Sequence, residues 1–151
     1  MKNKDHSLIL SLILTKLLLT GLILTAAAMP WVARAYDNNR MAAYGAQSLY
    51  PQILITFYLA VTTGMAAIFA LNKLLENIRK NAVFVRGNVH LIELISYFCF
   101  AEGIIFFWFG FFRPMSFVIS GASIFFGLAV KVLKNVFSAA VNIKEESDFT
   151  I

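Results

Sequence analysis

The chain has 151 residues, of which 60% are hydrophobic and 14% are charged, and its net charge is +5 at pH 7. A water-soluble fold of this composition would expose large apolar patches, which a lipid bilayer absorbs instead. The basic residues stand at the ends of apolar runs rather than together on one face, which argues against direct nucleic-acid binding. Cys99 is the only cysteine, so a disulfide within the chain and a cysteine-based metal site are both excluded.

The first apolar run covers residues 8–29 and is interrupted only by Lys16 and a few Ser and Thr residues. About 22 residues rising ~1.5 Å each match the ~30 Å hydrocarbon core of a bilayer, so we predict a membrane-spanning helix over about 8–30. Residues 33–35 have the small-x-small form of a signal-peptide cleavage site, which leaves cleavage as an alternative. We favour a retained helix, because the run is longer than the apolar region of a signal peptide and contains a lysine.

Pro30 is expected to end this helix, and the mixed residues 32–50 are expected to form a short external loop. The second helix is predicted over 52–80. It is apolar as far as Leu71 and amphipathic beyond, so its last part should leave the membrane and lie along the inner surface. Small and weakly polar residues let helix backbones approach closely in lipid, so this set is expected to face the inside of a bundle: Thr56, Thr62, Thr63, Gly64, Ala66 and Ala67.

The third helix is predicted over 89–112, with Asn88 as its N-cap, and the fourth over 115–146 after a tight hairpin. The apolar character of the fourth fades after about 29 residues, or ~44 Å of helix, which exceeds the hydrocarbon thickness by roughly 14 Å. The excess must project from the membrane. The chain then closes with the short acidic segment 144–151.

The expected fold is therefore all-α, an integral membrane four-helix bundle that forms one domain over 1–151. Basic residues indicate its orientation, because they concentrate in cytoplasmic segments. Nine fall on the side that holds both termini, three on the other side, and Lys16 inside the membrane completes the total of 13. Both termini are thus predicted to be cytoplasmic, with the last helix extending into the cytoplasm.

Glu102 is the strongest candidate for an intramembrane polar site, because an ionised carboxylate in hydrocarbon is costly unless it is paired, protonated or exposed to water. One interpretation is a proton or cation site of a small transporter. The other is a protonated carboxylate, or one paired with Lys16 at a comparable depth, that fixes helix packing. We favour the structural interpretation, because a transporter would show more polar residues along a path.

The remaining polar residues give little support for chemistry. His90 and Glu93 lie one helical turn apart and could form half of a metal site, but two ligands without a third and fourth are more typical of a solvated helix start. The sequence contains no phosphate-binding glycine loop, no nucleophile paired with a base and no HExxH motif. We therefore expect a protein that is not an enzyme and has no catalytic, metal or cofactor residues.

The C-terminal segment is the second candidate site, because a stiff helix that delivers a short charged peptide into the cytoplasm could dock a protein partner. The alternative is a solvated tail that only ends the chain. The residues that would make the docking contacts are Lys144, Glu145, Glu146, Asp148, Phe149 and Ile151.

Two segments carry a resemblance to a known family: ALNKLLENIRKNAVFVRGNVHLIELI at 70–95 and VFSAAVNIKEESDFTI at 136–151. They resemble domain-of-unknown-function family 2975, small four-helix membrane proteins of bacteria. Phe149 stands where the family usually has leucine, and Gly87 where a polar residue is commoner. The resemblance implies no reaction. It does imply that a small helix-turn-helix regulator is encoded beside the protein. The cytoplasmic face would sense or sequester that regulator.

These observations favour a non-enzymatic, multi-pass protein of the bacterial cell membrane whose cytoplasmic side, formed by 73–90 and the C-terminal extension, docks a small transcription regulator. The bilayer is its other partner, and homo-oligomerisation stays open. One alternative is a small transporter or channel that uses Glu102. Another is a passive immunity-type membrane protein.

Overall fold

The computed structural model describes residues 2–45 and 47–149 and contains four helices in this part of the chain. They are α1 (Lys2–Tyr44), α2 (Tyr50–Arg79), α3 (Arg86–Gly110) and α4 (Ser116–Phe149). Each is long and apolar enough to cross a bilayer. The prediction of an all-α four-helix bundle is thereby confirmed.

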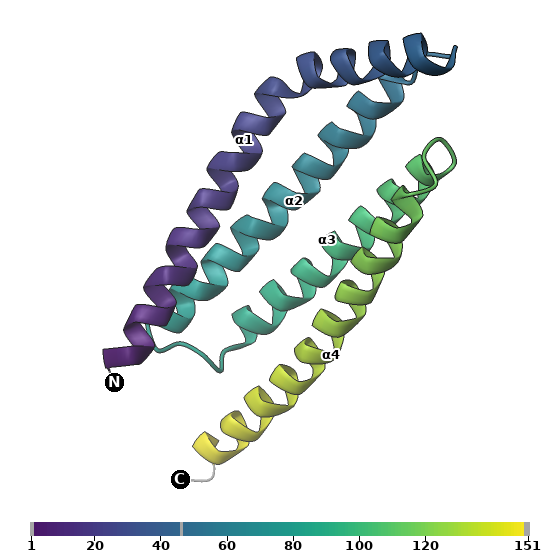
Figure 1. The fold of residues 1–151 in the computed structure, drawn as a ribbon. Coiled ribbons are helices and arrows are strands. Elements are labelled where there is room, and N and C mark those ends of the chain that lie inside the picture. The colour runs from purple at the N-terminus through teal and green to yellow at the C-terminus, as the bar shows by residue number, and fades with distance from the viewer. Residues whose placement is uncertain (1, 46, 150–151) are drawn as a thin grey trace.

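The bundle is open, because each helix packs only against its neighbours in sequence. Within the described ranges, Cα atoms closer than 8 Å join α1 to α2, α2 to α3 and α3 to α4, and no other pair of helices. Figure 1 shows this serial arrangement, with both termini at one end of the molecule. We call this the N/C end, which also holds the 80–85 connector. We call the opposite end, where α1 connects to α2 and α3 connects to α4, the far end.

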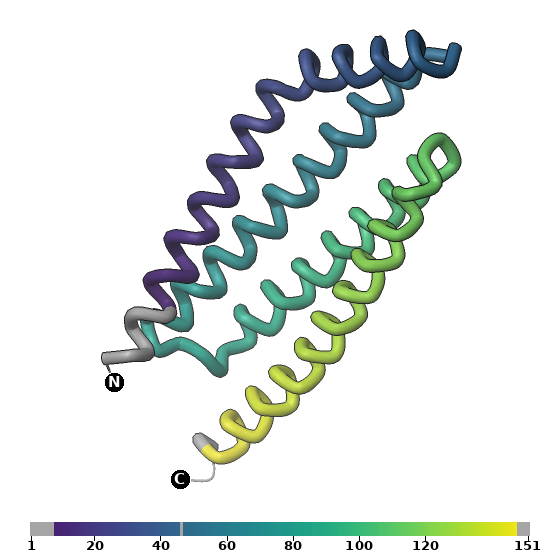
Figure 2. The backbone as a smooth tube through the Cα atoms, viewed as in Figure 1, coloured from purple at the N-terminus to yellow at the C-terminus, as the bar shows by residue number. Residues whose placement is uncertain are grey.

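The first helix differs most from its prediction. It was expected to end at Pro30, but it continues through Pro30 to Tyr44, so residues 32–44 are helical and the expected external loop is wrong. The trace in Figure 2 bends before this last part of α1. A proline inside a helix removes one backbone hydrogen bond and clashes with the carbonyl four residues earlier, which bends the helix without always ending it.

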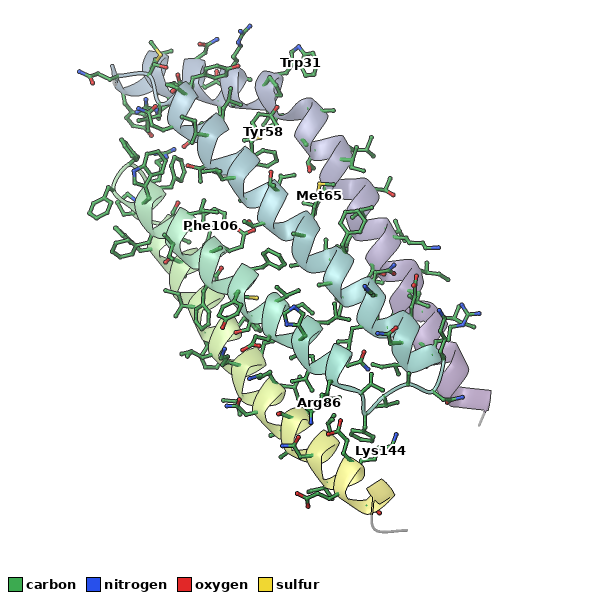
Figure 3. The ribbon with its side chains drawn as sticks, turned by 180° about the vertical axis from the view of Figure 1, so that it is seen from behind. Trp31, Tyr58, Met65, Arg86, Phe106 and Lys144 are labelled. Carbon is green, nitrogen blue, oxygen red and sulfur yellow. The ribbon has the colours of Figure 1, made fainter. Side chains whose placement is uncertain are left out.

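A contact from α2 compensates for the missing hydrogen bond. Pro30 cannot donate to the carbonyl of Ala26, which would lack a partner in an apolar environment. The hydroxyl of Tyr58 donates to that carbonyl at 3.2 Å. Figure 3 shows Tyr58 on α2, with Trp31 on the bent part of α1 at the same end of the molecule. The long α1 is therefore stabilised by tertiary structure rather than by its own sequence.

The other helix boundaries lie close to their predictions, with two corrections. Asn88 is not the N-cap of α3, because Val85 occupies that position and α3 begins at Arg86. The C-terminal segment is helical as far as Phe149, so Asp148 and Phe149 extend α4 beyond its predicted end at residue 146.

Candidate functional site

The N/C ends of α3 and α4 form the surface that the sequence singled out for docking. The guanidinium of Arg86 donates two hydrogen bonds to the carboxylate of Glu145, from Nε to Oε1 at 2.9 Å and from Nη2 to Oε2 at 2.7 Å. An exposed ion pair adds little stability, but a bidentate geometry fixes position. The rings of Phe84 and Phe137 lie 6.0 Å apart and join the connector to α4.

A polar cavity of about 230 Å³ lies beside this ion pair, between α3 and α4. Glu93, on its wall, accepts a bond from Lys131 Nζ at 2.9 Å and lies 3.4 Å from Lys134 Nζ. His90 lines the same cavity. Across the described ranges, no three His, Cys, Asp or Glu side chains form a group that could hold a metal ion. The cavity is a polar recess lined by both acidic and basic side chains.

The predicted docking residues are brought together only in part. Lys144, Glu145 and Glu146 lie on α4, and Asp148 and Phe149 continue its backbone. Ile151 lies outside the described residues. Figure 3 shows Lys144 at the same end of the molecule as Arg86, on the adjacent helix. These residues are thus carried by a helix whose position is set by α3.

Asn88 organises the connector next to this surface, a role that the sequence did not indicate. Its side chain is fully buried and accepts a bond from Asn77 Nδ2 at 2.8 Å. Its own Nδ2 donates to the carbonyls of Ala82 at 2.7 Å and Val83 at 2.8 Å. One amide thus links the end of α2, the connector and the start of α3. The run of asparagines at 77, 81 and 88 is the sequence signal that could have suggested such a link.

The two candidate intramembrane residues are not brought together. Glu102 on α3 accepts a hydrogen bond of 2.6 Å from Thr63 on α2. Lys16 instead lines a cavity with Glu76 and Lys80 near the N/C end of α2. Thr15 contacts Asn72, which lies nine residues along α2 from Thr63, or about 13 Å at 1.5 Å per residue. The hypothesis that Lys16 pairs with Glu102 at a similar depth is therefore wrong.

The far end contains a second polar cluster that the sequence analysis missed. The Asp37 carboxylate, almost fully buried, accepts bonds from Ser48 Oγ at 2.5 Å and from the Leu49 N–H at 2.9 Å. Arg40 lies 3.3 Å from the same carboxylate and also donates to the carbonyl of Gln47. This cluster fastens the end of α1 to the start of α2. The sequence predicts a loop over 32–50, in which Asp37 would have no fixed partners.

These features define the class of protein. Four long apolar helices with many large apolar side chains exposed are the signature of a multi-pass α-helical membrane protein, in which lipid covers the outer faces.

The chain belongs to the family described as "Protein of unknown function (DUF2975)", whose model matches residues 24–151. The expected family membership is thereby confirmed. No curated protein and no solved structure matches the chain. The description of this family names no activity.

Proposed function

We propose that this chain is a non-enzymatic protein of the bacterial cell membrane that docks a cytoplasmic protein partner on its N/C end. The observation that carries the proposal is the bidentate Arg86–Glu145 pair, which holds the projecting end of α4 against the start of α3. Docking costs less when the binding surface is already ordered. Segments at this end carry nine of the 13 Lys and Arg residues, which supports a cytoplasmic placement for both termini.

The length of α4 supports the same conclusion. Arg86 begins α3 and bonds to Glu145, so α3 starts level with Glu145 on α4. The residues from 146 to 149 then extend beyond α3 by about 6 Å, at 1.5 Å per residue. We propose that this last turn of α4 enters a groove of the soluble partner.

The partner that we propose is a small helix-turn-helix transcription regulator. The end of α4 is acidic in sequence, with Glu145, Glu146 and Asp148 close together. DNA-binding proteins present basic surfaces, so an acidic projection would compete with DNA for the same face of the regulator. Capture at the membrane would then keep the regulator from its operator.

The proposal is tested by capture from native membranes with the full chain and with a version truncated after Ile143. The captured protein is identified by mass spectrometry, purified and titrated against the reconstituted full chain. We expect a helix-turn-helix regulator that binds the full chain and not the truncated one. Equal capture by both versions would contradict docking at the C-terminal projection.

A charge exchange tests whether capture of the regulator depends on the Arg86–Glu145 ion pair or on the Glu145 charge alone. Glu145→Arg places two cations together and should weaken capture of the regulator. The double variant with Arg86→Glu restores an ion pair of reversed polarity and should recover most of it. Weak capture by both variants would show that the Glu145 charge itself contacts the partner, and unchanged capture by Glu145→Arg would remove the ion pair from the argument.

A further inference from the structure

An apolar cavity lies at the far end, away from the proposed docking surface. Its volume is about 450 Å³, within the ~300–1,000 Å³ range of small-molecule sites. The wall includes Met29 and Val32 on either side of the α1 bend, Ile53 in the first turn of α2, and Phe109 and Met115 beside the α3–α4 turn. The cavity exists because α1 continues past Pro30 across the far end.

A second, more polar cavity of about 660 Å³ shares two of its residues, Tyr36 and Arg113, with the first. Its other lining residues include Asn39, Arg40 and Tyr44. The two spaces therefore adjoin each other at one cationic side chain, that of Arg113. An apolar chamber and a polar chamber that meet at an arginine are suited to an amphiphile.

The charge at this end is unbalanced. Arg34, Arg40 and Arg113 stand against a single carboxylate, that of Asp37, in the segments 30–51 and 107–117. Arg40 pairs with Asp37 at 3.3 Å, whereas the Arg113 guanidinium lies 5.0 Å from the centre of the Tyr36 ring and has no carboxylate partner in the described ranges. Arg113 is thus a cation with its anion-binding edge unused.

The depth of the two cavities matches the layers of a bilayer. Residues 8–29 of α1 supply about 33 Å of apolar helix, enough for the ~30 Å hydrocarbon core. Met29 therefore lies near the hydrocarbon boundary, and Tyr36 and Arg113 lie in the headgroup layer. Trp31 and Tyr44, which are 73% and 82% exposed, are residue types that favour this layer.

We propose that this site binds one anionic phospholipid of the adjoining leaflet. An acyl chain occupies the apolar cavity, and the phosphate lies against Arg113 with the headgroup in the second cavity. Arginine binds phosphate through two parallel N–H groups, and basic pockets between membrane helices bind anionic headgroups in this way. The proposal is independent of the docking function, because it concerns the opposite end of the molecule.

The test is lipid retention measured by native mass spectrometry on the purified full chain, titrated with phosphatidylglycerol or phosphatidylcholine. We expect one phosphatidylglycerol to be retained in preference to phosphatidylcholine. Arg113→Gln should weaken phosphatidylglycerol binding about tenfold, because a charge-assisted hydrogen bond is lost. Arg113→Lys should recover part of the affinity. The matched control is Arg34→Gln, which removes the same charge from the same end, because Arg34 stacks on Tyr50 and lines neither cavity.

A second variant tests the acyl-chain cavity. Val32 is 56% exposed and lines the cavity, so Val32→Trp should occupy its mouth without disturbing the core and should also reduce retention. Leu24→Trp, on the exposed side of the same helix, is its control and should retain the lipid. Equal retention of both lipids, or no effect of either site variant, would overturn the proposal in favour of unspecific boundary lipid. Retention of free oleate in place of phosphatidylglycerol would also overturn it.

Discussion

The α3–α4 pair and the α1–α2 pair are both antiparallel apolar hairpins, but they are held together in different ways. In α3–α4 the backbones approach so closely that a Cβ atom on Gly103 would lie 2.6 Å from the Ile124 side chain. In α1–α2 a Cβ atom on Gly21 would meet nothing within 4 Å. The first pair is joined along its length by close packing, which is the main attraction between helices in lipid.

Serine hydroxyls add to the close packing of α3 against α4, whereas the hydroxyl bonds between α1 and α2 come from longer contacts. In α3–α4, Ser96 donates to the carbonyl of Gly127 at 2.9 Å, and Ser120 donates to that of Gly103 at 2.7 Å. In α1 the hydroxyl of Thr25 returns to its own helix, to the carbonyl of Gly21. Between α1 and α2, the hydroxyl of Thr15 donates to Asn72 at 3.3 Å and that of Tyr58 to the Ala26 carbonyl at 3.2 Å, and the Asp37 cluster joins the far ends. This difference suits α3–α4 to be the rigid base of the proposed docking surface.

The largest expected effect comes from breaking the close packing. Gly103→Leu forces its side chain into Ile124 and should lower the free energy of unfolding by about 2–3 kcal/mol, the usual cost of overpacking. Gly21→Leu is the matched control in α1 and should be neutral. The measurement is unfolding in mixed micelles, followed by circular dichroism as the denaturing detergent increases. Equal losses of stability in Gly103→Leu and Gly21→Leu would contradict the difference in packing between α3–α4 and α1–α2.

The next largest effect is expected at Tyr58, whose hydroxyl compensates for the backbone hydrogen bond that Pro30 removes from α1. Tyr58→Phe removes the donor to the Ala26 carbonyl and should cost about 1–2 kcal/mol, because the carbonyl is then left without a partner in hydrocarbon. Tyr44→Phe, with its ring 82% exposed, should cost nothing measurable. In a Pro30→Ala background the backbone supplies the missing N–H, so Tyr58→Phe should become nearly neutral. A double-mutant cycle without coupling between Pro30 and Tyr58 would contradict this account.

A smaller effect is expected from the buried serines. Interhelical hydrogen bonds in membranes contribute about 0.6 kcal/mol on average, so Ser96→Ala and Ser120→Ala together should cost about 1 kcal/mol. Thr25→Ala, whose hydroxyl bonds only within α1, is the control. Thermal unfolding of the purified protein resolves a difference of this size. A larger loss of stability from Thr25→Ala than from the two serine variants would contradict the stabilising role of the serine hydroxyls between α3 and α4.

The four helices were predictable because length and hydropathy alone decide whether a segment can span a bilayer. The path of α1 was not. Proline commonly ends a helix, and what keeps α1 intact is the Tyr58 hydroxyl from another helix, which no local pattern reveals. The Asp37 cluster was hidden for the same reason, since it forms only once α1 continues past Pro30.

The close packing of α3 against α4 could have been found. Ser96, Gly103 and Gly110 recur at every seventh position of α3, and Ser120 and Gly127 do so in α4. A repeat of seven keeps small residues on one face of a packed helix, so it predicts a close interface. The sequence analysis placed the small-residue interface on α2 alone. The separation of Lys16 from Glu102 needed the structure, because it depends on the relative heights of α1 and α3, which do not pack directly against each other in the described ranges.

The smallest expected effect concerns the hydrogen bond between Thr63 and Glu102, which links the α1–α2 pair to the α3–α4 pair. Glu102 accepts its bond from Thr63, and the amide oxygen of a glutamine can accept the same bond. Glu102→Gln should therefore change the free energy of unfolding by less than about 0.6 kcal/mol, whereas Glu102→Leu should lose the whole interhelical bond. Proton flux into liposomes containing the protein separates the two interpretations of this residue. For a packing contact, the flux is the same for the parent chain and Glu102→Gln, and a proton-coupled flux that disappears in Glu102→Gln would make Glu102 part of a transport path instead.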